Sequence, residues 1–177
     1  MVGTGGFLQP EEVIKQLNIR KNIQVADFGC GAGYFTIPLA KVVGEGVVYA
    51  FDVMEQALES VRSRAKIQGL FNIETRRCNL ENPSGSGLII NSIDLVVLAN
   101  ILFQSSKKLD IIKEAKRVLK KGGEMVIIDW QPDKPMGPPK DLIASQDTIK
   151  KMAQAEGLIF KKEITVDVYH WGMVFSK

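Results

Sequence analysis

Short apolar segments alternate with amphipathic segments along most of the chain, and this alternation constrains the fold more than any other feature of the sequence. Residues 93–99 (IDLVVLA) form a nearly continuous apolar run, which is typical of a strand covered by helices on both faces. Residues 106–119 carry apolar side chains at helical spacing. Strands that alternate with helices predict a mainly parallel sheet with helices on both of its faces.

Similar apolar and amphipathic patterns predict an element for most of the chain. Strands are expected at residues 23–28, 47–51, 72–78, 93–99, 124–130, 158–166 and 171–175. Helices are expected at residues 10–17, 35–43, 55–68, 106–119 and from Ser145, a capping residue, to Gly157. Gly122 and Gly123 are expected to end the fourth helix before the fifth strand begins.

The last two predicted strands are separated by only a few residues, 167–170. A parallel crossover needs about a dozen residues or more, so the last strand must run antiparallel to the strand before it. Because that preceding strand runs parallel to the others, the turn between the two lies at the carboxyl edge of the sheet.

Composition and charge exclude several classes of protein. The chain has 177 residues, of which 45% are hydrophobic and 24% are charged, and we expect residues 1–177 to form a single domain. A formal net charge of +3 is too small to indicate nucleic acid as a partner. We find no membrane-spanning run and no signal peptide, so the cytoplasm is the expected location. Nothing in the sequence indicates the oligomeric state.

Two cysteines and one histidine, Cys30, Cys78 and His170, cannot supply the clustered ligands of a structural zinc site. We therefore expect no metal.

A glycine-rich segment, DFGCGAG at residues 27–33, follows the first predicted strand. Its glycines give the pattern G-x-G-x-G, whereas a dinucleotide-binding loop would need glycine where Tyr34 stands. Asp27 places a carboxylate directly before the turn, which would repel a pyrophosphate and attract an amino group or a sulfonium. The loop therefore favours a ligand that carries positive charge, and a nicotinamide dinucleotide is disfavoured.

This segment, followed by Asp52 at the end of the second strand, resembles the class I S-adenosylmethionine-dependent methyltransferases, and among them the small-molecule branch that is similar to type 11 methyltransferases. The resemblance covers nearly the whole chain. It implies an α/β, three-layer Rossmann-like methyltransferase fold with a seven-stranded, mostly parallel sheet whose last strand is antiparallel. It also implies S-adenosyl-L-methionine as the cofactor.

The resemblance further implies roles for residues of the glycine loop. Gly29, Gly31 and Gly33 would bring the backbone close to the methionyl part of the cofactor, and Cys30 would lie beside it. Asp27 would lie near the cofactor's ammonium group.

Beyond the loop, the resemblance implies that the carboxylate of Asp52 accepts hydrogen bonds from both ribose hydroxyls, although a helix N-cap is an alternative role for this residue. Val53, Leu80 and Asn100 would also line the cofactor site. Asn79 stands where the family often has an acidic residue that touches the adenine amino group, and a plain turn residue is an equally good interpretation.

The two cysteines are expected to be reduced thiols. In the family's strand order the second strand lies between Cys30 and Cys78, so that the two are about 10 Å apart and cannot be bridged. This disfavours the arsenic-methylating branch of the family, which depends on several cysteines.

The acceptor side is harder to assign, because methyl transfer needs the acceptor to be held in line and does not always need a base. The candidate catalytic residues are Asn100 after the fourth strand, Asp129 at the end of the fifth, and His170 in the last turn. Two of them have a structural alternative: a cap for Asn100, and packing against Trp171 for His170. The proline-rich loop at residues 131–139 is expected to wall the acceptor pocket, with a surface connection as the alternative.

We therefore predict a methyltransferase that acts on a small molecule. Nearby alternatives are a methyltransferase for protein or RNA and a non-catalytic module that binds the cofactor. A useful discriminator is whether Asn100, Asp129 and His170 converge on one open cavity, because a non-enzyme would fill that space with side chains.

Overall fold

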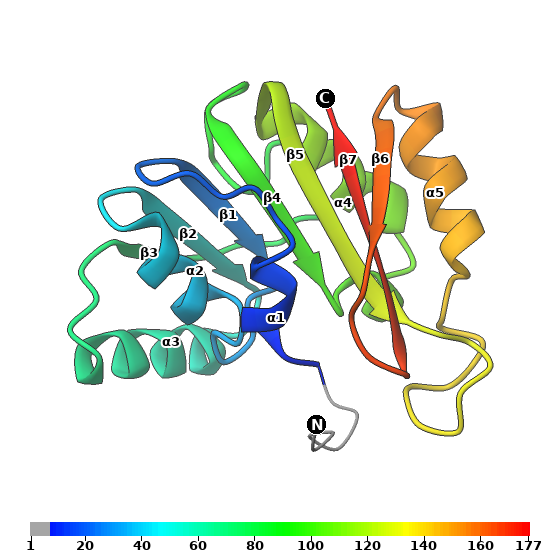
Figure 1. Cartoon of the computed structure of the whole chain (residues 1–177), viewed down its shortest axis with the longest axis horizontal. Helices are drawn as coiled ribbons and strands as arrows, with labels where there is room; N and C mark the ends of the chain where they lie inside the picture. The colour runs from blue at the N-terminus through cyan, green and yellow to red at the C-terminus, as the bar shows by residue number, and fades with distance from the viewer. Residues whose placement is uncertain (1–7) are drawn as a thin grey trace.

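The computed structural model describes residues 8–177 and contains one seven-stranded sheet of order β3-β2-β1-β4-β5-β7-β6 (Figure 1). Its strands are β1 (Gln24–Phe28), β2 (Val47–Asp52), β3 (Ile73–Arg77), β4 (Ile93–Ala99), β5 (Leu119–Trp130), β6 (Ile159–Ile164) and β7 (His170–Ser176). The pairs β1·β2, β1·β4, β2·β3 and β4·β5 are parallel. The predicted α/β fold class is confirmed.

The last strand runs against its two neighbours, as the short connection predicted. β7 pairs antiparallel with both β5 and β6. In the β5·β7 register, Trp130 lies opposite His170, so the start of β7 meets the carboxyl end of β5. His170 is therefore the first residue of the strand rather than a turn residue.

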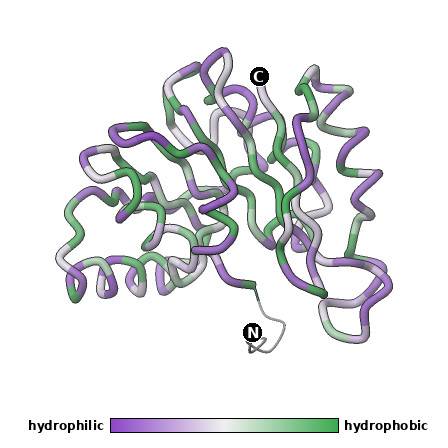
Figure 2. Tube along the Cα trace, viewed as in Figure 1, coloured by the Kyte–Doolittle hydropathy of each residue, from purple (hydrophilic) through white to green (hydrophobic). Residues whose placement is uncertain are grey.

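Helices cover both faces of the sheet. They are α1 (Pro10–Ile14), α2 (Thr36–Val43), α3 (Glu55–Ile67), α4 (Lys108–Val118) and α5 (Gln146–Ala155), with a short 3-10 helix η1 (Leu102–Gln104). Apolar residues of α1 and α2 pack on one face and those of α4 and α5 on the other. Figure 1 shows α1 in front of the sheet and α4 behind it, and Figure 2 shows hydrophobic residues concentrated along the central strands.

Alternation along β5 decides which residues face which layer. Val126 and Ile128 pack with α1 and α2, whereas Met125 and Ile127 pack with α4 and α5. Continuing this alternation by strand geometry places the side chain of Trp130 on the α1/α2 face and that of Asp129 on the α4/α5 face.

The start of β5 differs from the prediction. The strand begins at Leu119, which pairs with Ile93, instead of at Glu124. Gly122 and Gly123 do not end the helix, because both belong to strand β5. The Gly122 N–H donates to the carbonyl of Lys177, and the Lys177 N–H donates to the carbonyl of Gly123. Local composition cannot reveal this pairing, since its partner, Lys177, is remote in the sequence.

Both cysteines lie just beyond the end of a strand. Cys30 follows β1 in the glycine loop, and Cys78 follows β3. Both are free thiols, as predicted. In the described part of the chain, residues 8–177, no helix is long and apolar enough to cross a membrane.

Candidate active site

The glycine loop is fixed to the end of β2 by hydrogen bonds. The N–H groups of Gly29 and Cys30 both donate to the carbonyl of Phe51, at 2.9 and 2.8 Å. The N–H of Gly31 donates to one carboxylate oxygen of Asp52, and the N–H of Met54 donates to the other, each at 2.9 Å. Asp52 therefore fixes both its own turn and the glycine loop. The N-cap of α3 is Met54 rather than Asp52, and the ribose role of Asp52 stays a prediction.

The glycines of the loop serve different purposes. A side chain at Gly29 would collide with Ile101, whose Cδ1 lies 2.7 Å from the position of a Cβ atom, and one at Gly33 would crowd Val61 at 3.1 Å. At Gly31, with φ of +50°, a Cβ would meet nothing within 4 Å. Packing therefore requires Gly29 and Gly33 to be small, whereas Gly31 borders open space that a ligand can enter.

One cavity, which we call the Asp52 cavity, opens where β1, β2 and β3 end. It measures about 330 Å³ and combines Asp52 with an apolar wall. Its lining includes Gly29, Gly31, Asp52, Val53, Asn79, Leu80, Ile101 and Gln104. The oxygen of the Asn79 side chain accepts from the Glu81 N–H at 2.9 Å, so Asn79 shapes the turn and lines the cavity at once.

A second cavity, which we call the Trp130 cavity, adjoins the first at the carboxyl edge of the sheet. It measures about 420 Å³, and its lining includes Asp27, Gly29, Cys30, Gly31, Tyr34, Phe35, Asn100, Gln104, Trp130 and His170. Gly29, Gly31 and Gln104 belong to both cavities. The two spaces therefore meet at the glycine loop.

Asp27 is a buried carboxyl in the wall of the Trp130 cavity. Its Oδ2 accepts a hydrogen bond from the hydroxyl of Thr36 at 2.5 Å. Burial raises the pKa of Asp27 from 3.8 to about 6, although the hydrogen bonds from Thr36 act in the opposite direction. A cation bound beside Asp27 would compensate for this burial.

Asp129 does not reach either cavity. Its Oδ2 accepts from the Phe103 N–H at 3.1 Å and its Oδ1 from the Trp130 N–H at 2.8 Å. Burial raises the pKa of this carboxyl to about 6. The structure thus brings Asn100 and His170 to one cavity and leaves Asp129 on the other face of the sheet, where it fixes the backbone at the end of β5.

His170 is paired with a carboxylate that sequence reasoning missed. Its Nδ1 lies 2.9 Å from both side-chain oxygens of Asp167, and the two side chains are only 5% and 4% exposed. The Trp130 ring packs on the imidazole, with centroids 4.1 Å apart. A possible signal was the acidic residue three positions before the only histidine, within a short connection.

The remaining predicted residues are Gly33, the two cysteines and the loop at residues 131–139. Gly33 lines neither cavity, because it packs beneath α3. Burial raises the pKa of the Cys30 thiol above its usual range and that of Cys78 to about 11, so both stay protonated. The loop at residues 131–139 lies behind Trp130, since a side chain at Gly137 would meet its ring at 2.8 Å, and it does not itself line the cavity.

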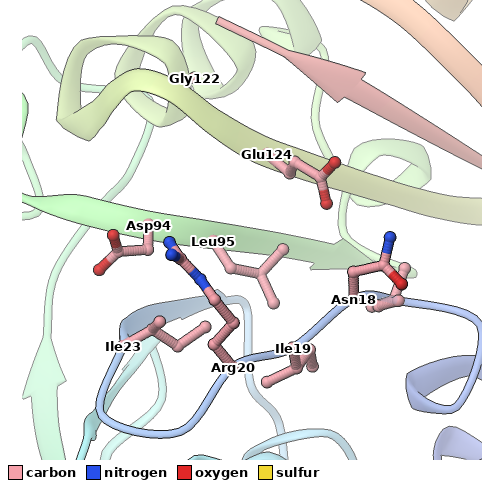
Figure 3. Close-up of a pocket in the computed structure, with 9 residues that line it drawn as sticks. Asn18, Ile19, Arg20, Ile23, Asp94, Leu95, Gly122 and Glu124 are labelled. Carbon is pink, nitrogen blue, oxygen red and sulfur yellow. The ribbon is translucent and has the colours of Figure 1, made fainter.

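A third hollow lies at the opposite, amino edge of the sheet (Figure 3). Figure 3 shows Arg20, Asp94 and Glu124 around it. Its volume of about 100 Å³ is small, and the Asp94 carboxylate already accepts from Lys120 and from the Gln24 N–H. This hollow is remote from the glycine loop and is not a candidate active site.

The strand order, the glycine loop after β1 and the acidic residue that ends β2 beside an open cavity define a class I S-adenosylmethionine-dependent methyltransferase fold. Comparison with known proteins supports the same class. The methyltransferase domain family matches residues 19–170, and this chain belongs to that family.

Relatives and solved structures point the same way. The chain is 31% identical over 121 residues to a demethylmenaquinone methyltransferase of Geobacillus stearothermophilus, covering 67% of this chain and 50% of that protein. It therefore spans about half the length of the curated relatives it matches. A crystal structure of an S-adenosylmethionine-dependent methyltransferase from Aquifex aeolicus superposes with a TM-score of 0.86 at 28% identity, covering 96% of this chain and 89% of that one.

A more distant structure, the [4+2]-cyclase SpnF, has a TM-score of 0.82 at 14% identity over 95% of this chain and 80% of that one, and shares the fold alone. Fold by itself therefore leaves the reaction open.

S-adenosylmethionine is the cofactor of this class, and the residues present fit it. Gly31 leaves room at the cavity wall that any side chain would fill. Asp52 offers carboxylate oxygens that accept hydrogen bonds, and Val53, Leu80 and Ile101 provide apolar sides for a planar base.

Proposed function

We propose that this chain transfers the methyl group of S-adenosylmethionine to a small-molecule acceptor that binds in the Trp130 cavity. The observation that carries the proposal is the junction of two cavities at Gly29 and Gly31. A donor in one cavity and an acceptor in the other would meet at this junction. Positioning two reactants in this way supplies much of the catalysis in a displacement reaction.

Residues of the Asp52 cavity would hold the nucleoside part of the cofactor. Asp52 would accept from the ribose hydroxyls, and Val53, Asn79 and Leu80 would enclose the adenine. Asp27 would face the ammonium group at the entrance to the Trp130 cavity, with Cys30 beside it. When bound, S-adenosylmethionine supplies an electrophilic methyl group on a sulfonium sulfur.

The chain's own contribution is to bind, orient and exclude water. Asn100 and His170 would contact the acceptor, because both line the Trp130 cavity. Asp129 would be a positioning residue, since it holds the backbone of Phe103 and Trp130 and touches neither cavity.

Two observations favour a small acceptor. The Trp130 cavity, at about 420 Å³, falls in the size range of small-molecule sites. The curated relatives are named for methylation of demethylmenaquinone, a small molecule. The cavity is also open rather than filled with side chains, which favours an enzyme over a non-catalytic binding module.

Calorimetry with S-adenosylmethionine, S-adenosylhomocysteine and NAD tests the cofactor assignment, and we expect binding of the first two only. Transfer of labelled methyl from the cofactor should then be measured against small molecules, bulk RNA and bulk protein in parallel. Label found only in RNA or protein would refute the small-molecule assignment. Cofactor binding without transfer to any fraction would favour the non-catalytic module.

A further inference from the structure

Three residues of the Trp130 cavity carry polar atoms without a hydrogen-bond partner. They are the side-chain oxygen of Asn100, the indole nitrogen of Trp130 and Nε2 of His170, all shielded from solvent and unpartnered within residues 8–177. Leaving a buried polar group unsatisfied costs about 1 to 3 kcal/mol each. Their gathering on one cavity indicates a ligand with both donor and acceptor groups.

The pairing with Asp167 fixes the tautomer of the neutral imidazole. Asp167 Oδ1 already accepts from the N–H groups of Tyr169 and His170, at 2.7 and 2.9 Å. An ionised carboxylate can only accept, so the proton between it and the ring belongs to Nδ1 of His170. The neutral ring then carries its lone pair on Nε2.

The ring is also held in place. Trp130 packs on it from β5, and the side-chain amide of Gln131 donates to the His170 carbonyl at 3.0 Å. A base that is fixed in position, shielded from bulk water and supported by a carboxylate is well placed to accept a proton from a bound acceptor.

We propose that His170, oriented by Asp167, takes the proton of a hydroxyl group on the acceptor, so that the substrate is a phenol or an enol. This inference rests on the proposed function and names the substrate class of the same site. A neutral amine already has a nucleophilic lone pair and needs no base before transfer, whereas an unionised hydroxyl does. The aromatic lining of Tyr34, Phe35 and Trp130 suits a planar, apolar acceptor.

The transfer makes one bond, breaks one bond and moves one proton. The acceptor oxygen forms a new bond to the methyl carbon, and the carbon–sulfur bond breaks with its electron pair left on sulfur. The hydroxyl proton moves to Nε2 of His170, and the resulting imidazolium is stabilised by Asp167. One positive charge is lost at sulfur and one is gained at the imidazole.

Because the sequence contains one histidine, nitrogen NMR of an untagged, histidine-labelled protein reports on His170 alone. We expect the ring, in its neutral form, to carry its proton on Nδ1 both in the free protein and with S-adenosylhomocysteine. In Asp167→Asn the amide donates to Nδ1, and the proton should move to Nε2. A wild-type ring protonated on Nε2 would overturn the proposal without any acceptor being known.

A series of phenols of graded acidity gives the second test. His170→Gln should lower the rate about a hundredfold on a weakly acidic phenol, the usual scale of general-base catalysis. On a nitrophenol that is already ionised at the assay pH, the same variant should lose little. Asp167→Asn should follow the same pattern more weakly, and an unchanged affinity for S-adenosylhomocysteine would show that the fold is intact.

Failure of the general-base proposal can be distinguished from failure of the proposed function. Equal losses on both phenols would indicate a structural role and overturn the proposal. Methylation of an amine or a thiol, with no hydroxyl compound accepted, would overturn it and leave the proposed function standing. Absence of cofactor binding would refute the proposed function itself.

Discussion

The buried carboxyl of Asp27 should make the dissociation constant of the cofactor depend on pH. Its pKa is raised from 3.8 to about 6 by burial in the unliganded protein. A bound ammonium group would favour the ionised form of Asp27. Where the Asp27 carboxyl is protonated, it must therefore lose its proton when the cofactor binds. The apparent dissociation constant should therefore rise as pH falls through 6.

The magnitude follows from the fraction of protein in which Asp27 is protonated. With a pKa of about 6, this fraction is about one in eleven at pH 7 and about ten in eleven at pH 5, so the dissociation constant should rise about tenfold between the two. This corresponds to about 1.4 kcal/mol of binding free energy. Calorimetry with S-adenosylhomocysteine, which keeps the ammonium group, measures it directly.

The chain offers a matched control. Asp129 is also buried, also has a pKa of about 6, and lines neither cavity. Asp27→Asn should bind more weakly at pH 7 and lose most of the pH dependence, whereas Asp129→Asn should retain it. A flat profile in the wild type, or the same slope in Asp27→Asn, would refute the placement of the ammonium group.

Three further predictions concern the site and its stability. Asp52→Ala should weaken cofactor binding by about 1 to 3 kcal/mol in calorimetry, because charge-assisted acceptors are lost; an unchanged constant would refute the ribose assignment. Gly31→Val should abolish cofactor binding, because its side chain enters the cavity; retained affinity would place the cofactor elsewhere. The free energy of unfolding of the wild type relative to Asp129→Asn should fall by about 2 kcal/mol as pH rises from 4 to 7, because the folded state binds this proton more tightly than the unfolded state; denaturant titrations at several pH values measure it, and a pH-independent difference would contradict the raised pKa.

Local pattern determined most of the fold. Apolar runs such as residues 93–99 and the helical spacing at 106–119 placed strands and helices close to their observed bounds. The short connection at 167–170 required an antiparallel last strand, because chain length alone forbids a crossover. The glycine loop and Asp52 could be paired from sequence because each follows directly from the end of a strand.

Tertiary structure decided what depends on register. Asp129 and His170 both stand at the carboxyl edge, but strand alternation and the pairing of Trp130 with His170 place them on opposite faces of the sheet. Gly122 and Gly123 belong to β5 because they exchange hydrogen bonds with Lys177, which is remote in the sequence. The contact between Asp167 and His170 likewise depends on how the turn closes over β5. The spacing of apolar residues in the sequence indicates whether a segment is a helix or a strand. Contacts between side chains of different strands depend on the register of the sheet, which is set only when the chain folds.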